Sequence, residues 1–175
     1  MVLPIVYAGA PVLRQKARVL STEELKSRAI AELVDRMRET MRAAPGVGLA
    51  APQIGEPLAL AVIEDRAEYQ DKLAPEEIAR RERQPVPFHV IANPRLTVLE
   101  AAPAVFLEGC LSVPGYAAEV PRALAVKVEA LDHRGERVVI ETRGWHARIL
   151  QHEIDHLEGT LYIDRMDSRT FVATG

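Results

Sequence analysis

Two histidines and a glutamate near the C-terminus have the spacing of a metal-binding helix. Within residues 151–156, His152 and His156 are four positions apart, so in a helix they lie one turn apart on the same face. Two imidazoles at this spacing can hold one divalent ion. Glu153 lies beside the first histidine and could accept a proton from water at that ion. The alternative is a buried structural helix that carries these residues by chance.

A third metal ligand is expected from a different part of the chain. A tetrahedral catalytic site takes three protein ligands and leaves one position open, and the histidines supply only two. Cys110 is the only cysteine. The preceding Gly109 would let an ion crowd the backbone, and the amide of Leu111 would then point into the site. Alternatively, the cysteine is a small buried hydrophobic residue. Asp155 and Glu158 offer carboxylates, but from the wrong side of the helix.

The apolar residues around the histidines favour a buried helix. Trp145 and Ile149 continue the row of the histidines at 3.6-residue spacing, and a second apolar row runs through residues 150–157. Gly159 comes just past the expected end, where a left-handed cap would fit. Apolar rows on two sides predict a helix that is buried nearly all round.

Composition limits the classes of protein that fit. The chain has 175 residues, of which 48% are hydrophobic and 27% charged, which predicts one domain over residues 1–175. A net charge of −3 argues against nucleic acid as a partner. No apolar run approaches the roughly 18 residues of a membrane span, and the N-terminus lacks the features of a signal peptide. We expect a cytoplasmic protein, although an organellar protein trimmed of its targeting segment would look the same.

The rest of the chain predicts helices mixed with mostly antiparallel strands. Ser21 can cap one amphipathic helix that ends before Pro45. Helical turns at 75–81 lie in a polar insert, residues 65–87, which we expect to be a solvated loop. Strands are expected at residues 58–63, 88–93, 95–106, 124–131, 138–140 and 160–163. The predicted fold is a single α+β domain whose mostly antiparallel strands pack around the metal-binding helix.

Residues 45–55 are unusually rich in small side chains. Gly46 and Gly48 would let the backbone approach a ligand or the central helix closely. A nucleotide-binding loop is not favoured, because no strand precedes the glycines and the third glycine is missing. Gln53 is the one side chain here with both a donor and an acceptor. It could face a ligand, or it could brace the loop.

Three stretches together resemble the peptide deformylases. They are residues 46–53 (GVGLAAPQ), 108–112 (EGCLS) and 151–156 (QHEIDH), which occur in the order and approximate spacing of that family. The resemblance covers essentially the full length of the chain. The insert at 65–87 and the ending at 169–171 resemble the type I branch that includes organellar enzymes and some bacterial ones.

The resemblance implies metal-dependent removal of the formyl group from the N-terminal methionine of newly made polypeptides. It implies that Glu153 is the general acid and base, and that Gln53 and the Leu111 amide bind the developing oxyanion. The implied metal ligands are Cys110, His152 and His156. The family uses ferrous iron in cells and often carries zinc or nickel after purification, so we expect one divalent ion, Fe²⁺ in the native protein. With iron, we expect oxygen sensitivity.

The resemblance also implies contacts around the ion. Substrate would meet backbone groups of Val47, Gly48 and Gly109, and the metal loop would be braced by the pair Glu108 and Arg122. From helical spacing and the first motif, the residues expected to hold the methionine side chain are Ile149, Val47 and, with weaker support, Trp145. They could equally be ordinary core. Arg148 could lie at the pocket rim and meet substrate, or it could be a surface charge.

The expected partners are formylmethionyl nascent peptides, with transient proximity to the ribosome. The tail after Asp164 does not resemble the long C-terminal helix that some bacterial deformylases use for ribosome docking. We expect no direct contact with nucleic acid or membrane, and the sequence does not predict an oligomeric state.

Two other functions compete with this prediction. A general zinc metallopeptidase of the His-Glu-x-x-His type would use a third ligand other than Cys110 and would cleave unformylated peptides. A non-catalytic protein with a closed structural zinc site would need a fourth protein ligand. His146 does not suit that role, because it lies six residues before His152 and projects from another side of the helix.

Overall fold

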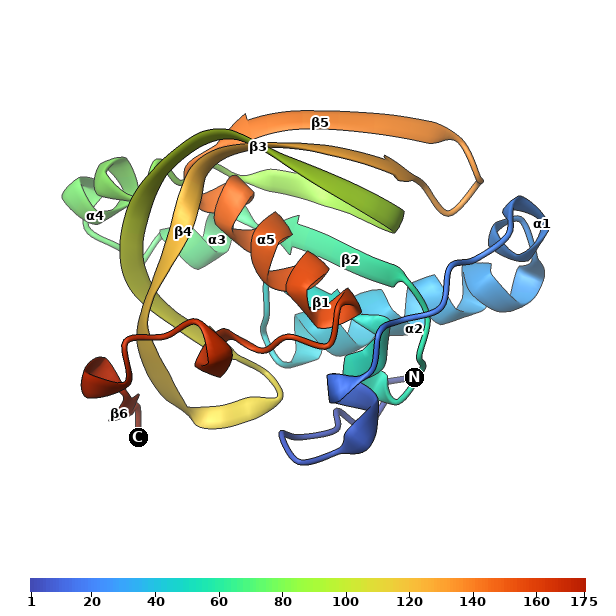
Figure 1. The fold of residues 1–175 in the computed structure, drawn as a ribbon, viewed down its shortest axis with the longest axis horizontal. Helices are drawn as coiled ribbons and strands as arrows, with labels where there is room; N and C mark the ends of the chain where they lie inside the picture. Colours follow the sequence, from blue (N-terminus) through green and yellow to red (C-terminus); the bar gives the residue numbers. More distant parts are fainter.

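The computed structural model describes all of residues 1–175 and combines helices with an antiparallel sheet (Figure 1). The helices are α1 (Thr22–Leu25), α2 (Arg28–Ala43), α3 (Ala67–Gln70), α4 (Pro75–Arg80) and α5 (Trp145–Leu157), with 3₁₀ turns η1 (Pro11–Arg14), η2 (Ala51–Ile54), η3 (Tyr162–Asp164) and η4 (Ser168–Thr170). The strands are β1 (Gly48–Ala50), β2 (Leu60–Asp65), β3 (Val86–Cys110), β4 (Val113–Leu131), β5 (Arg137–Arg143) and β6 (Val172–Ala173). None of the helices is long and apolar enough to cross a membrane.

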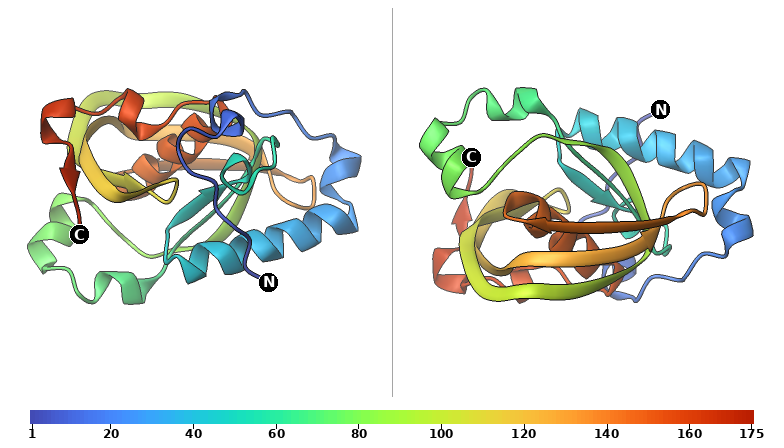
Figure 2. Two further views of the ribbon diagram at one scale, coloured as in Figure 1. Left: turned by 90° about the horizontal axis from the view of Figure 1, so that it is seen from below. Right: turned by 90° about the horizontal axis from the view of Figure 1, so that it is seen from above.

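The strands form one sheet with order β1-β2-β3-β4-β5, and β6 pairs with β4 off this path. All of these pairings are antiparallel. Figures 1 and 2 show β3 and β4 running side by side and curving around α5. The sheet therefore forms a concave surface that holds α5, as the mixed antiparallel prediction required.

Two strands predicted at 88–93 and 95–106 are one continuous strand, β3. The pairing register with β4 shifts between Ala92 and Arg95 and again near Glu100, and such bulges bend a strand without ending it. Asn93 takes a positive φ of 50° and exchanges two hydrogen bonds with Leu20. The sequence break at this point is therefore a bulge. Strand β4 also begins earlier than predicted. Two prolines interrupt the alternating pattern in its first half, so the pattern did not indicate a strand there.

Helix α5 is buried nearly all round, as predicted, since seven of its 13 residues are buried and none is exposed. Ile149, Leu150 and Leu157 belong to the core cluster that also contains residues of β2, β3 and β4. Gly159 has φ +77°, and a Cβ there would lie 2.7 Å from the carbonyl oxygen of Arg14. This left-handed glycine ends the helix as expected.

The single helix predicted after Ser21 is two helices, α1 and α2. Ser21 caps α1 in a capping box with Glu24, and Ser27 then accepts a hydrogen bond from the amide of Ile30 and starts α2. A second capping hydroxyl inside the run explains the break. Helix α2 ends at Ala43, before Pro45, and packs its apolar face on β1 and β2.

The last strand predicted, at 160–163, is wrong. This segment forms the 3₁₀ turn η3 because the carboxylate of Asp164 accepts a hydrogen bond from the amide of Leu161 at 2.9 Å. In the insert, the helical turns predicted at 75–81 are confirmed as α4. The insert is less solvated than predicted, since its Arg83 and Asp65 form a buried ion pair at 2.8 Å.

Candidate active site

The sulfur of Cys110 and ring nitrogens of His152 and His156 lie within 4.8 Å of one another. Cys110 is the last residue of β3, and both histidines lie on the face of α5 that is directed toward Cys110. The sulfur is 3.4 Å from Nε2 of His156, and the two imidazole centroids are 5.0 Å apart. The structure therefore brings together the three residues that were predicted from separate motifs.

This donor set suits a divalent transition metal, because thiolate and imidazole are its usual protein ligands. His152 makes a hydrogen bond through Nδ1 to Glu108 at 2.6 Å, which leaves its Nε2 for an ion. In His156, the buried Nδ1 has no hydrogen-bond partner. No fourth His, Cys, Asp or Glu belongs to this cluster, and His146 instead packs against His89. The residues fit an open three-ligand site and do not fit a closed structural one.

Glu108 organises the residues behind this cluster. Its buried carboxylate accepts hydrogen bonds from Arg122 Nε and Nη2 at 3.1 and 2.7 Å, from Arg148 at 2.6 Å and from His152. Burial raises the pKa of Glu108, but its hydrogen bonds from His152 and Arg122 outweigh burial and hold the pKa far below its usual range. The predicted pair of Glu108 and Arg122 is thus present, and it fixes the orientation of a histidine in the cluster.

Glu153 is buried beside the cluster and faces β1. It is 4% exposed, and its Oε2 has no hydrogen-bond partner. Burial raises the pKa of Glu153 to about 7. A Cβ placed on Gly48 would lie 2.4 Å from Oε1 of Glu153, so only glycine allows this approach. The close contact expected between the small-residue loop and the central helix is confirmed.

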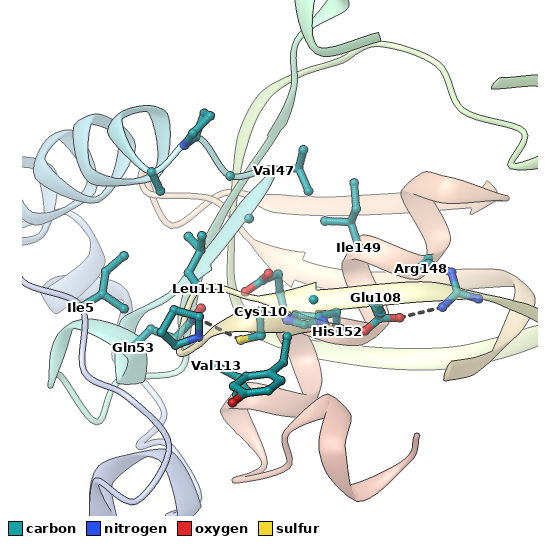
Figure 3. A pocket seen from close by; sticks show the side chains of 18 of the residues that line it. Ile5, Val47, Gln53, Glu108, Cys110, Leu111, Val113, Arg148, Ile149 and His152 are labelled. Atoms are coloured by element: carbon teal, nitrogen blue, oxygen red, sulfur yellow. Dashed lines mark hydrogen bonds and ion pairs between the residues drawn. The ribbon is translucent and has the colours of Figure 1, made fainter. Parts of the chain in front are cut away.

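Gln53 braces the loop, which is one of the two roles that its sequence position left open. Its Oε1 accepts a hydrogen bond from the amide of Ala50 at 3.0 Å, which braces the loop. Its Nε2 donates to Ser112 at 3.1 Å and approaches the sulfur of Cys110 at 3.6 Å. Figure 3 shows the amide pointing toward the cysteine. Gln53 is therefore held in one orientation with its donor toward the cluster.

A cavity of about 650 Å³ opens onto the cluster (Figure 3). Of the predicted site residues, His156 and Arg122 lie behind it, and the rest line it: Val47, Gly48, Gln53, Glu108, Gly109, Cys110, Leu111, Arg148, Ile149, His152 and Glu153. Val47 and Ile149 also pack against the core. Ile5, Tyr7 and Tyr116 line the cavity too, but no local signal in the sequence marks them.

The surface alternative for Arg148 is wrong. The residue is 3% exposed, and its guanidinium donates to Glu108 and to the carbonyl oxygens of Val120 and Ala104 at 2.9 and 2.7 Å. Figure 3 shows its guanidinium directed at the carboxylate of Glu108. Most of its hydrogen-bonding capacity is therefore used within the protein.

A buried acid beside a cluster of one cysteine and two histidines, at a partly apolar cavity, is the arrangement typical of mononuclear metallohydrolases. The chain belongs to the polypeptide deformylase family, whose family model matches residues 2–171.

Relatives and solved structures agree with this membership. The chain is similar to peptide deformylase 1A, chloroplastic/mitochondrial, of Arabidopsis thaliana, with 49% identity over 167 residues, 95% of this chain and 62% of the relative. It is similar to peptide deformylase 3 of Streptomyces avermitilis, with 50% identity over 96% of this chain and 73% of the relative. The chain thus spans about three fifths of the length of the plant relative.

Among solved structures, the fold is similar to the Met-Ala-Ser-bound class I type b peptide deformylase of Acinetobacter baumannii. The TM-score is 0.83 and the identity 34%, over 95% of this chain and 99% of that chain. Organellar and bacterial deformylases are thus both among the similar proteins, and a general metallopeptidase is not favoured.

Proposed function

We propose that this protein removes the formyl group from the N-terminal methionine of newly synthesised polypeptides and releases formate. The observation that carries the proposal is the cluster of Cys110, His152 and His156 beside the buried Glu153, in a chain that belongs to the polypeptide deformylase family. Residues 1–175 would act as one catalytic domain, folded around α5 as the metal-binding helix.

Cys110, His152 and His156 would hold one divalent ion, with Fe²⁺ as the native ion and Zn²⁺ or Ni²⁺ as replacements. When bound, such an ion acts as a Lewis acid that makes water more acidic and polarises a carbonyl group. The soft thiolate sulfur and the two imidazole nitrogens favour a transition metal over Mg²⁺ or Ca²⁺, which prefer oxygen ligands.

Glu153 would move the proton in the reaction. A carboxylate oxygen of Glu153 would take a proton from the attacking water and then give it to the amine nitrogen that leaves the formyl carbon. Its burial supports this role, because a pKa near 7 lets the same group accept and donate at neutral pH. Closeness to Gly48 keeps the carboxylate over the cluster.

Gln53 and Leu111 would stabilise the charge that develops on the formyl oxygen. The Nε2 group of Gln53 and the backbone N–H of Leu111 would donate to this oxygen, and each donor lost from such a site costs about 3 kcal/mol. The hydrogen bond from Ala50 to Gln53 supports the role, because it fixes which end of the amide faces the cluster. A fixed donor needs no reorganisation during the reaction.

The substrate would lie along β1 with its methionine side chain in the cavity. Strand β1 is an edge strand that pairs only with β2, so backbone groups of Val47 and Gly48 can accept an extended peptide as a further strand. Gly109 would contact it from the other wall. Ile149 and the stem of Arg148 would contact the methionine. We propose nascent formylmethionyl peptides, in the cytoplasm or in an organelle, as the substrates.

Gly48→Ala should lower activity by at least about tenfold, because moving a catalytic group by about 1 Å can cost up to a hundredfold. The new methyl group would lie 2.7 Å from the carboxyl carbon of Glu153 and would displace it. Steady-state formate release checks this result. In the matched control Gly109→Ala, the nearest atom to the new Cβ is 3.3 Å away, and the loss should be smaller. An equal loss in both variants would contradict the proposed closeness to Glu153.

The activity is tested by incubating the iron-loaded protein, without oxygen, with formyl-Met-Ala-Ser. We expect one formate and one free Met-Ala-Ser for each substrate consumed. A general metallopeptidase would instead cut within the peptide and would also attack unformylated Met-Ala-Ser. Peptide-bond cleavage without formate release would overturn the proposal.

A further inference from the structure

A second, smaller cavity adjoins the candidate active site. It measures about 100 Å³ and shares Trp145 and Arg148 with the larger cavity. Its other walls come from the end of α4, the curved middle of β3 and β4, and the residue before α5. Figure 1 shows α4 beside the bend of β3. The space would hold a few water molecules or one compact ion.

Positive charge dominates the walls of this smaller cavity. Four arginines line it, namely Arg80, Arg81, Arg122 and Arg148, against one acid, Glu82. Glu82 forms an ion pair with a fifth arginine, Arg143, at 2.8 Å. Arg80 and Arg81 share the carboxylate of Glu77, and Arg122 and Arg148 share that of Glu108, with Asp155 as a second partner of Arg122. The four arginines therefore outnumber the carboxylates that pair with them. Burial lowers the pKa of Arg148, the charge and hydrogen bond of Glu108 raise it in part, and repulsion from Arg122 and Arg81 lowers it again. An anion in the cavity would relieve this repulsion.

Arg81 has hydrogen-bond donors that the protein leaves unused. Its side chain is 18% exposed, and its one hydrogen bond runs from Nε to Glu77 at 3.1 Å. Both terminal NH₂ groups therefore have no acceptor in the protein. Arg122, in contrast, uses all three nitrogens on Glu108 and Asp155. A mostly buried guanidinium with two free NH₂ groups is suited to a carboxylate, which it can hold through two hydrogen bonds.

Stacking holds these guanidiniums in place. Arg81 lies 4.6 Å from the ring centroid of Trp145 and 5.1 Å from that of Phe106, and Arg80 lies 4.7 Å from Phe106. A guanidinium that stacks through its face keeps its edge available for hydrogen bonds. These contacts also attach the insert to the body of the protein. Alternatively, these contacts only attach the insert, and the cavity then binds no anion.

The start of α5 adds to the attraction for an anion. The helix begins at Trp145, beside the cavity, with no side-chain cap and no acidic residue in its first turn. No side chain in the cap or first turn therefore offsets its positive end. The indole Nε1 of Trp145 is also buried without a partner, so a further donor near the cavity is unsatisfied.

From these observations we infer that the smaller cavity is a binding site for a small carboxylate anion of the size of formate. Arg80 donates to Glu77 through Nε and Nη2, which leaves its Nη1 free. This Nη1 and the NH₂ groups of Arg81 would hold the anion. The site is separate from the metal cluster, because neither arginine lines the larger cavity. This inferred anion binding is a separate property and does not depend on the proposed deformylase activity. Occupancy would neutralise the arginines and fasten the insert against the wall that the two cavities share.

Trp145 makes the site directly observable, since it is the only tryptophan of the chain. The zinc-loaded protein is titrated with sodium formate that replaces sodium pivalate at constant ionic strength. Pivalate carries the same charge on a much bulkier group and serves as the reference anion. We expect a saturable change in tryptophan emission. Arg81→Gln should raise the formate concentration at half-saturation by at least about tenfold, as expected for losing a charge-assisted hydrogen bond.

The matched control is Arg28→Gln, which removes an equal charge at a side chain that is 91% exposed and paired only with Glu32. It should leave the midpoint unchanged. Arg80→Gln is a second test if Arg81→Gln does not fold, and it should also raise the midpoint. A change that does not saturate would overturn the inference. So would an unchanged midpoint in the Arg80 and Arg81 variants, which would place formate at the metal cluster or elsewhere.

Discussion

Replacing Glu153 with alanine should reduce formate release from formyl-Met-Ala-Ser by at least about a hundredfold, while the bound metal is retained. The carboxylate is buried and has one oxygen without a partner, and alanine offers no group that could carry the proton in its place. The residue is outside the Cys110, His152 and His156 cluster, and the metal content should therefore stay near that of the wild type. The measurement combines initial rates with metal analysis of the same anaerobic sample.

Glu158→Ala is the control for this variant. Glu158 is the residue just after α5, its side chain is exposed, and its carboxylate pairs only with Lys16, at 3.7 Å. Its rate should match the wild type. If Glu153→Ala and the wild type released formate at equal rates, Glu153 would have no part in the mechanism.

Replacing Glu108 with alanine should have the largest effect on stability. It leaves Arg122 and Arg148 buried without their shared carboxylate, and breaking such buried pairs costs about 3–5 kcal/mol. His152 would also lose the hydrogen bond to its Nδ1. Losing an orienting partner of this kind lowers metal affinity by about 10- to 100-fold. Denaturant unfolding of the metal-free protein and a competitive metal titration measure the two effects.

The contribution of Glu108 to the free energy of unfolding should decrease as the pH falls. Its pKa in the folded protein is far below its usual range, so its contribution to stability is present above the unfolded pKa of about 4.3. That contribution is lost as the pH falls below this value. The difference in stability between wild type and Glu108→Ala should therefore shrink in acid. Glu100→Ala is the control, since its ion pair with Arg143 is exposed, and a comparable loss there would contradict the account.

The chemistry of the site could be predicted from short-range patterns. The spacing of His152 and His156 follows from the period of a helix, and Cys110 followed from the number of ligands that a catalytic site needs. For Gly48 and Glu153, the sequence predicted that the small-residue loop approaches a ligand or the central helix. It did not predict which residues meet, because the two are about a hundred positions apart in the chain. Local patterns therefore predicted which residues form the site, but their contacts became clear only from the structure.

Residues with distant partners were harder to predict. Arg148 could have been a surface charge, because the groups that bury it, Glu108 and the carbonyl of Val120, lie 40 and 28 positions away. The insert read as a solvated loop, because nothing near Arg81 in the sequence shows that it stacks on Trp145. Strand β3 read as two strands, because its bulges carry the same signals as turns.

The central claim is that one sulfur and two imidazoles hold a single ion and leave a position open. X-ray absorption at the zinc edge of the zinc-loaded protein measures this directly. We expect one sulfur at about 2.3 Å and two histidine nitrogens at about 2.0–2.1 Å, and the loss of the sulfur in Cys110→Ala. A spectrum of the wild-type protein without sulfur, or with a third histidine nitrogen in the fourth position, would contradict the account.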